Sequence, residues 1–198
     1  MYQSSFGRSA ALAAALGMLC APVLAQDQVQ MIIDRGLTDD LPYTAIYPNA
    51  LQSIDDGSSE TILTLQHPDA LLRCDFLSVP GASDGWTAES ALSSLDVAGI
   101  EATWTPNFPG FKLDNQSIAR FASGPALFYE GQADSSPMGP PVAIIHAEAV
   151  DNGRSYAVEC LVDRNVAAEA RPMIDFIIAN FSTKSDGQCC IDPTDDRG

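Results

Sequence analysis

Two histidines are the only side chains of this sequence whose ordinary pKa suits general-base chemistry near neutral pH. His146 precedes Glu148 by two positions in a strand-like segment, and residues two apart on a strand leave the same face. Such a pair could supply two metal ligands, or a base with the carboxylate that orients it. His67 precedes Pro68 in a predicted turn, where we expect an exposed residue. His146 and Glu148 therefore indicate either a small hydrolase-like site or an ordinary polar sheet face.

Motifs that would identify a reaction are absent from the sequence. It contains no H-E-x-x-H or C-x-x-C zinc pattern, no G-x-S-x-G elbow, no P-loop and no Rossmann glycine fingerprint. The acidic segment 55–60 offers oxygen ligands but lacks the EF-hand spacing. We therefore expect no cofactor, and a binding module is favoured over an enzyme.

Aromatic residues give the stronger indication of a binding site. Trp86, Trp104, Phe108 and Phe111 surround a predicted helix and the loop that leaves it. Together they could line a pocket for a small molecule or form a patch for a partner protein. The alternative is that the two tryptophans pack the helix onto a sheet.

Cysteine usage predicts disulfides in an oxidising compartment. Apart from Cys20 in the N-terminal apolar run, the chain has an even number of cysteines. Cys74 and Cys160 lie on the apolar sides of two alternating segments, so they could bridge if those strands are neighbours. Two unpaired core thiols are the alternative. Cys189 and Cys190 are adjacent in an acidic tail, where bonds to other cysteines are easier than a bond between the two.

The first 25 residues have the three-part pattern of an export signal. Arg8 is the one cation of a polar start, and Ala10–Leu19 is an apolar run too short to span a bilayer. Val23–Ala25 then provides suitable residues for cleavage near Ala25, and removing 25 residues from the 198 leaves 173. We expect a periplasmic or secreted protein with no integral membrane segment after cleavage.

The charge of the chain excludes some partners. Its net charge is −16, and loss of Arg8 with the signal makes the remaining domain −17. Such a field repels phosphate backbones and anionic headgroups, so neither nucleic acid nor a membrane surface is an expected partner. A protein or small-molecule partner remains, and the charge permits a cationic one. Solubility alone would also account for the acidity.

The order of elements predicts one α+β domain over residues 26–182, followed by an acidic, cysteine-containing tail over 183–198. Thr87–Val97 has apolar residues three and four apart, which predicts one helix ending near Gly99. Tyr43–Ile54 mixes strand formers with a proline, which favours an irregular segment or an edge strand. Two hairpins are predicted, over Thr61–Gln66 with Leu71–Val79 and over Pro141–Val150 with Arg154–Asp163.

A last helix is predicted within Asn165–Ser182, where apolar residues recur with a period of 3.6. Pro172 implies either that the regular helix starts near it or that an earlier turn joins at a kink. The helix is expected to pack on the antiparallel sheet.

Two segments resemble the PsbP-like α+β proteins, a group named for an extrinsic photosystem subunit that includes many small exported bacterial proteins. Gly153–Cys160 is similar to a final strand entered by a tight turn, and Pro172–Ser182 is similar to the closing helix of that group. The resemblance implies the fold, an antiparallel sheet with helices packed on it. It implies no role for any particular residue.

Overall fold

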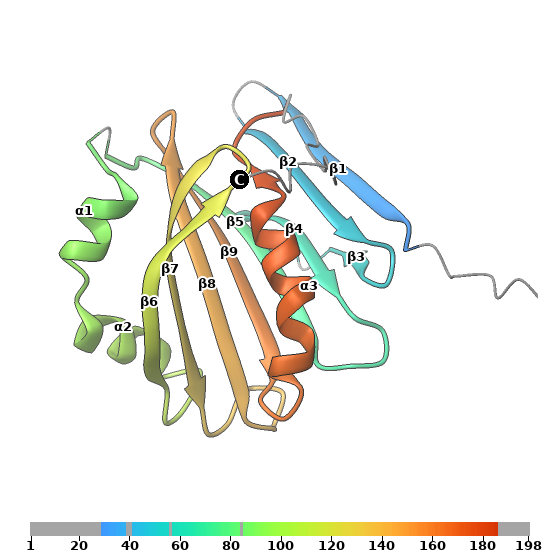
Figure 1. Cartoon of the computed structure of the whole chain (residues 1–198), viewed down its shortest axis with the longest axis vertical. Helices are drawn as coiled ribbons and strands as arrows, with labels where there is room; N and C mark the ends of the chain where they lie inside the picture. Colours follow the sequence, from blue (N-terminus) through green and yellow to red (C-terminus); the bar gives the residue numbers. More distant parts are fainter. Residues whose placement is uncertain (1–28, 39–40, 56, 84, 186–198) are drawn as a thin grey trace, which may run out of the picture.

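The protein folds into two antiparallel sheets and three helices over the residues that the computed structural model describes, which are 29–38, 41–55, 57–83 and 85–185 (Figure 1). One sheet has the order β1-β2-β10 and the other the order β3-β4-β5-β9-β8-β7-β6. The α+β class with a C-terminal helix on the sheet is therefore confirmed. The strands are β1 (Met31–Thr38), β2 (Leu41–Pro48), β3 (Gln52–Ile54), β4 (Thr61–Gln66), β5 (Leu72–Pro80), β6 (Lys112–Phe121), β7 (Gly124–Ala133), β8 (Val142–Asp151), β9 (Arg154–Asp163) and β10 (Phe181–Ser182), and the helices are α1 (Ala88–Ser93), α2 (Val97–Trp104) and α3 (Ala167–Ala179).

Both hairpins expected from the sequence are present. β4 pairs with β5, and β8 pairs with β9 through all ten of its residues. Asn152 and Gly153 connect the second pair with φ angles of 49° and 69°, the left-handed region that a tight two-residue hairpin turn requires. The Asp-Asn-Gly signal therefore set the register of the strands that form the middle of the large sheet.

The segment expected to form one helix after the first hairpin is divided into α1 and α2. Thr87 begins α1 with a capping box, because its hydroxyl accepts from the Ser90 amide and the Ser90 hydroxyl accepts from the Thr87 amide. Asp96 then begins α2, and Gly99, expected to end a helix, lies inside it. A Cβ at Gly99 would come within 2.5 Å of an Asp96 carboxylate oxygen, so glycine leaves room for this helix start.

The α3 helix covers one face of the large sheet (Figure 1). It starts at Ala167 and contains Pro172, so of the two expectations the earlier start is observed. Ile174, Ile177 and Ile178 are buried on its inner face, as their spacing predicts. They join residues of β5, β8 and β9 in the main hydrophobic core.

The small sheet covers the same face beside α3, and its central strand differs from expectation. Within Tyr43–Ile54, β3 is an edge strand, but β2 lies between β1 and β10 and is buried on both sides from Tyr43 to Tyr47. A strand buried on both faces has no alternation, so its sequence reads as irregular. Phe181 of β10 packs its ring against those of Phe76 and Phe121, with centroids 5.3 and 5.0 Å apart.

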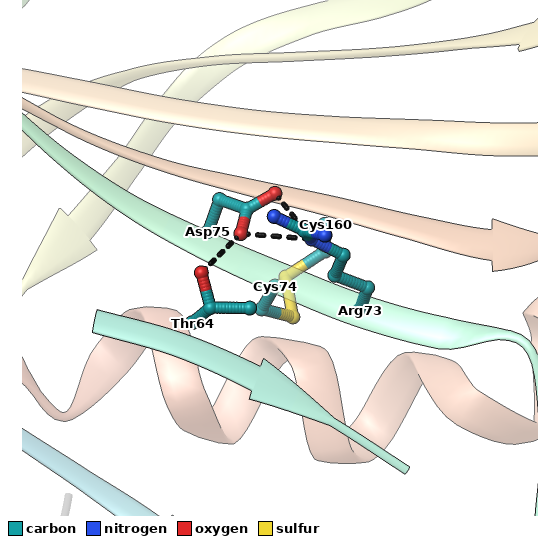
Figure 2. Close-up of polar contacts among 5 residues, drawn as sticks. All are labelled: Thr64, Arg73, Cys74, Asp75 and Cys160. Atoms are coloured by element: carbon teal, nitrogen blue, oxygen red, sulfur yellow. Dashed lines mark hydrogen bonds and ion pairs between the residues drawn. A yellow bond between two sulfur atoms is a disulfide. The ribbon is translucent and has the colours of Figure 1, made fainter. Parts of the chain in front are cut away.

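A disulfide joins Cys74 of β5 to Cys160 of β9 (Figure 2). The two residues are register partners on neighbouring strands, with Cα atoms 4.0 Å apart, and both are fully buried in the main core. The sequence allowed a bridge between Cys74 and Cys160 only if their strands were neighbours, and β5 and β9 are neighbours. Cys189, Cys190 and the expected signal segment lie outside the described residues.

The described part of the expected tail is not all exposed. Thr183 is buried, and its hydroxyl donates to the Asp151 carboxylate at 2.6 Å. None of the helices within the described ranges combines the length and the apolar character needed to cross a membrane.

Candidate functional site

An open cavity of about 480 Å³ lies between the α1–α2 pair and β7. Trp86 and Trp104, the chain's two tryptophans, both contribute to its wall. From β7, Leu127 and Tyr129 supply the sheet side of the same wall. The remaining lining residues come from the two short helices and the junction between them and are mostly small or aliphatic: Ser90, Ala91, Ser94, Leu95, Asp96, Gly99, Ile100 and Thr103.

The other two aromatic residues singled out from the sequence do not line the cavity. Phe108 and Phe111 are buried in a second hydrophobic cluster with Val142 and Ile144 of β8. Their ring centroids lie 5.4 and 5.8 Å from that of Trp104. They therefore pack beneath Trp104 and fix its position, whereas the two tryptophans are the members of the set that reach the cavity.

The break between α1 and α2 gives the cavity its shape. Ser94 ends α1 and Asp96 begins α2, so the two helices meet at a corner, and residues from both line the same space. Ala88 is the buried residue of α1, and Trp86, just before it, packs partly against the main core. A single straight helix would present one apolar stripe to the sheet, whereas two short helices leave a hollow at their junction.

Tyr129 lines the cavity as well and is the residue of the candidate site that the sequence did not indicate. Its hydroxyl accepts a hydrogen bond from Trp104 Nε1 at 3.2 Å, which ties the sheet wall of the cavity to its helix wall. Burial raises the pKa of Tyr129 well above its usual range, with the carboxylates of Glu159 and Glu148 adding to the effect against the Trp104 bond. The phenol stays neutral, and its proton has no acceptor within the described part of the chain.

His146 lies directly behind Tyr129, its register partner on β8. The two rings are stacked, with centroids 4.4 Å apart and planes 12° from parallel. Nδ1 of His146 is 3.1 Å from Glu159 Oε1, and Nε2 is 3.6 Å from Glu148 Oε2, too far for a hydrogen bond. His146 does not line the cavity, so the two sites considered from the sequence are neighbours joined through Tyr129.

Both carboxylates act on the protonation of the imidazole. Burial alone lowers the pKa of His146, but Glu148 and Glu159 together outweigh it and the net shift is upward. The pKa of Glu148 is lowered by His146, and by the Ser155 hydroxyl that donates to it at 2.7 Å, against the effect of burial. The two carboxylates thus favour the protonated imidazole, the form that cannot accept a proton from a substrate.

Polar side chains continue from His146 and its register partner Glu159 along the same face of the sheet. Glu159 is the register partner of Asp75 on β5, and Asp75 pairs in turn with Thr64 on β4. Asp75 accepts from the Thr64 hydroxyl at 2.7 Å and from Arg73 Nε at 2.8 Å, beside the disulfide (Figure 2). Within the described ranges no group of three His, Cys, Asp or Glu side chains is arranged to hold a metal ion.

We expect the stability that His146 and Glu148 contribute to be complete between their ordinary pKa values, 4.5 for Glu148 and 6.5 for His146. The raised pKa of His146 gives stability that is complete below 6.5 and is lost as pH rises through the folded-state pKa. The lowered pKa of Glu148 gives stability that is complete above 4.5 and is lost as pH falls through its folded-state pKa. Urea unfolding across a pH series checks this expectation.

The control replaces Glu148 and Glu159 by glutamine, which keeps their shape and removes both charges. Burial of the imidazole then acts alone, so the folded-state pKa of His146 is expected to fall below 6.5. NMR titration of the ring protons measures it directly, and the variant His67→Gln assigns the second histidine signal of the chain. A His146 titration that is the same in both proteins would contradict the arrangement.

Comparison with known proteins identifies the fold. No family model matches the chain, and no curated protein matches its sequence. Among solved structures, cyanobacterial PsbP (CyanoP) from Synechocystis sp. PCC 6803 superposes with a TM-score of 0.53 at 14% identity, covering 84% of this chain and 98% of that one. The Ran-binding protein Mog1p of Saccharomyces cerevisiae gives a TM-score of 0.50 at 8% identity, covering 78% and 96%. The chain therefore has the PsbP-like α+β fold that its last hairpin and closing helix indicated.

Proposed function

We propose that this protein is an exported domain that binds a small, largely apolar molecule in the cavity between α1, α2 and β7. The observation that carries the proposal is the convergence of Trp86, Trp104 and Tyr129 on one open hollow. Its volume of about 480 Å³ lies within the range of small-molecule sites, which are apolar hollows with a few placed polar groups. Here the placed groups are the neutral Tyr129 hydroxyl and the Asp96 carboxylate.

Two further features support a binding module in an oxidising compartment. The buried Cys74–Cys160 disulfide is the type of bond that persists outside the cytosol, in agreement with the signal expected over the first 25 residues. His146, the centre of the alternative hydrolase, has both ring nitrogens facing carboxylates and is separated from the cavity wall by the ring of Tyr129. These contacts favour binding over hydrolysis.

The fluorescent probe N-phenyl-1-naphthylamine, which is neutral and apolar, tests the proposal. Both tryptophans of the chain line the cavity, so a probe bound there is expected to quench their emission by energy transfer and to gain fluorescence itself. Ala91→Phe fills the cavity from α1 and is expected to weaken probe binding at least about tenfold, since it removes the space for an aromatic ring.

Ala102→Phe is the matched control. Ala102 lies on α2, is exposed and does not line the cavity, so the same added ring is expected to leave probe binding unchanged. Circular dichroism checks that both variants keep the fold. Equal binding by the wild type and Ala91→Phe would contradict the proposed site, as would the absence of any saturable quenching in the wild type.

A further inference from the structure

We propose that the molecule bound in this cavity is an organic cation whose substituted ammonium group lies against Trp86, Trp104 and Tyr129. The inference rests on the proposed binding function and adds the chemical class of the ligand. Aromatic rings present a negative face, and an ammonium group within about 6 Å of a ring centroid is attracted to it. Tryptophan gives the strongest such contact among the aromatic side chains, and this wall contains two tryptophans and a tyrosine.

The cavity wall carries negative charge and no positive charge among the described residues. Asp96 is the only charged residue in the described wall, and no lysine, arginine or histidine of the described part contributes to it. The Asp96 side chain makes no capping bond to α2, although it stands at the position where such bonds usually form. Its carboxylate therefore contributes to the same wall as the three aromatic residues and has no salt bridge within the described residues, and a ligand cation would supply a partner.

Gly99 makes this position of the carboxylate possible. A Cβ at residue 99 would lie 2.5 Å from Asp96 Oδ2, so any other residue would displace the acid. Both residues belong to the cavity wall, and the lack of a side chain on one allows the charge of the other to lie against the helix. The local arrangement thus keeps an exposed negative group in the wall of the cavity that Trp86, Trp104 and Tyr129 also line.

The net charge of the whole chain also favours a cationic ligand. A net charge of −16 attracts cations and repels anions at long range, so an anionic ligand would enter this cavity against the field. The Tyr129 hydroxyl, with a proton that no described residue accepts, could donate to an oxygen elsewhere on the ligand. An amphiphilic cation that carries a hydroxyl or carbonyl group fits both features.

Choline and 3,3-dimethyl-1-butanol form a matched pair of probes, because they share their shape and differ in the charge of the central atom. Tryptophan fluorescence and isothermal titration calorimetry measure their dissociation constants. We expect choline to bind about tenfold more tightly than the neutral alcohol, the gain that a cation–aromatic contact provides at a partly exposed site. Added salt should reduce that ratio, because Asp96 is exposed and its charge is screened.

Three variants test whether the preference for choline arises from the cavity wall. Asp96→Asn should reduce the choline preference severalfold, whereas Asp69→Asn, in the exposed β4–β5 turn, removes the same unit of charge away from the cavity and should leave it unchanged. Trp86→Leu keeps an apolar side chain and removes one of the three rings, so it should reduce the choline preference severalfold. Calorimetry serves for Trp86→Leu, because one fluorophore is lost.

The outcomes separate this inference from the proposed function. If the alcohol and N-phenyl-1-naphthylamine bind but choline binds no better than the alcohol, the cavity is a site for neutral ligands and the cation inference is overturned. If no probe binds, the proposed function fails with it. A choline preference that survives Asp96→Asn and Trp86→Leu would place the cation elsewhere and would also overturn the inference.

Discussion

Replacing both Cys74 and Cys160 by alanine is expected to lower the free energy of unfolding by about 4–5 kcal/mol. The bond joins residues 86 positions apart, and a cross-link over a loop of that length removes much conformational entropy from the unfolded chain. For a domain of this size the change corresponds to a fall in melting temperature of roughly 8–20 °C. Urea and thermal unfolding, followed by circular dichroism, measure the loss.

Because the disulfide is buried, its resistance to reduction provides a second measurement. Both cysteines are fully buried, so a mild reductant should leave the bond intact in the folded protein and cleave it once urea is added. Counting free thiols before and after urea checks this. The variant with alanine at Cys189 and Cys190 keeps the Cys74–Cys160 bond and serves as the control. A loss of less than about 1 kcal/mol in Cys74→Ala/Cys160→Ala would contradict the expectation.

The second large effect is expected at Phe181, where replacement by alanine should cost about 3–5 kcal/mol. The ring is fully buried and packs against Phe76, Phe121 and Tyr156, with centroids between 5.0 and 6.3 Å away. Removing it leaves a cavity between the small sheet and the large one. Chemical denaturation measures the global loss, and hydrogen exchange of the β2 amides reports whether the small sheet opens first.

Two other replacements are controls for the stability loss expected in Phe181→Ala. Phe181→Leu keeps most of the volume and should cost about 1–2 kcal/mol. Ile118→Ala, on the edge strand β6, shortens an aliphatic side chain that is 41% exposed and should change stability by about 0.5 kcal/mol or less. A Phe181→Ala loss as small as that of Ile118→Ala would show that the two sheets are held together by other contacts.

Local patterns were sufficient where one short segment decides the structure. The turn at Asn152 and Gly153 demands positive φ angles, and the sequence names it directly. The apolar spacing that includes Ile174 and Ile177 likewise located the buried face of α3. In the same way, the alternation around Cys74 and Cys160 placed both on the core side, although only the fold could bring the strands together.

The features that sequence reasoning missed depend on contacts between distant segments. β2 is buried from Tyr43 to Tyr47 and pairs with β10 from the far end of the described chain, and the sequence of Tyr43–Pro48 does not predict either feature. Tyr129 reads as one more core aromatic of a strand, yet its register opposite His146 and its bond from Trp104 make it the link between the two candidate sites. The corner between α1 and α2 is the exception, because it involves the local fit of Asp96 to Gly99, which the apolar spacing of Thr87–Val97 does not reveal.

The pairing of β10 with β2 also bears on how the chain reaches its folded state during synthesis. The Thr44 hydroxyl donates to the Lys184 carbonyl at 2.7 Å across 140 positions, so the small sheet closes only after nearly the whole chain has been made. Contacts of such long range are slow to form, because the loop between them must be closed before they contribute. A nascent chain that lacks Phe181 lacks the ring on which Phe76 and Phe121 pack in the folded protein. Under the proposed export, this delay would keep the polypeptide in the unfolded form that threads through a narrow secretion channel.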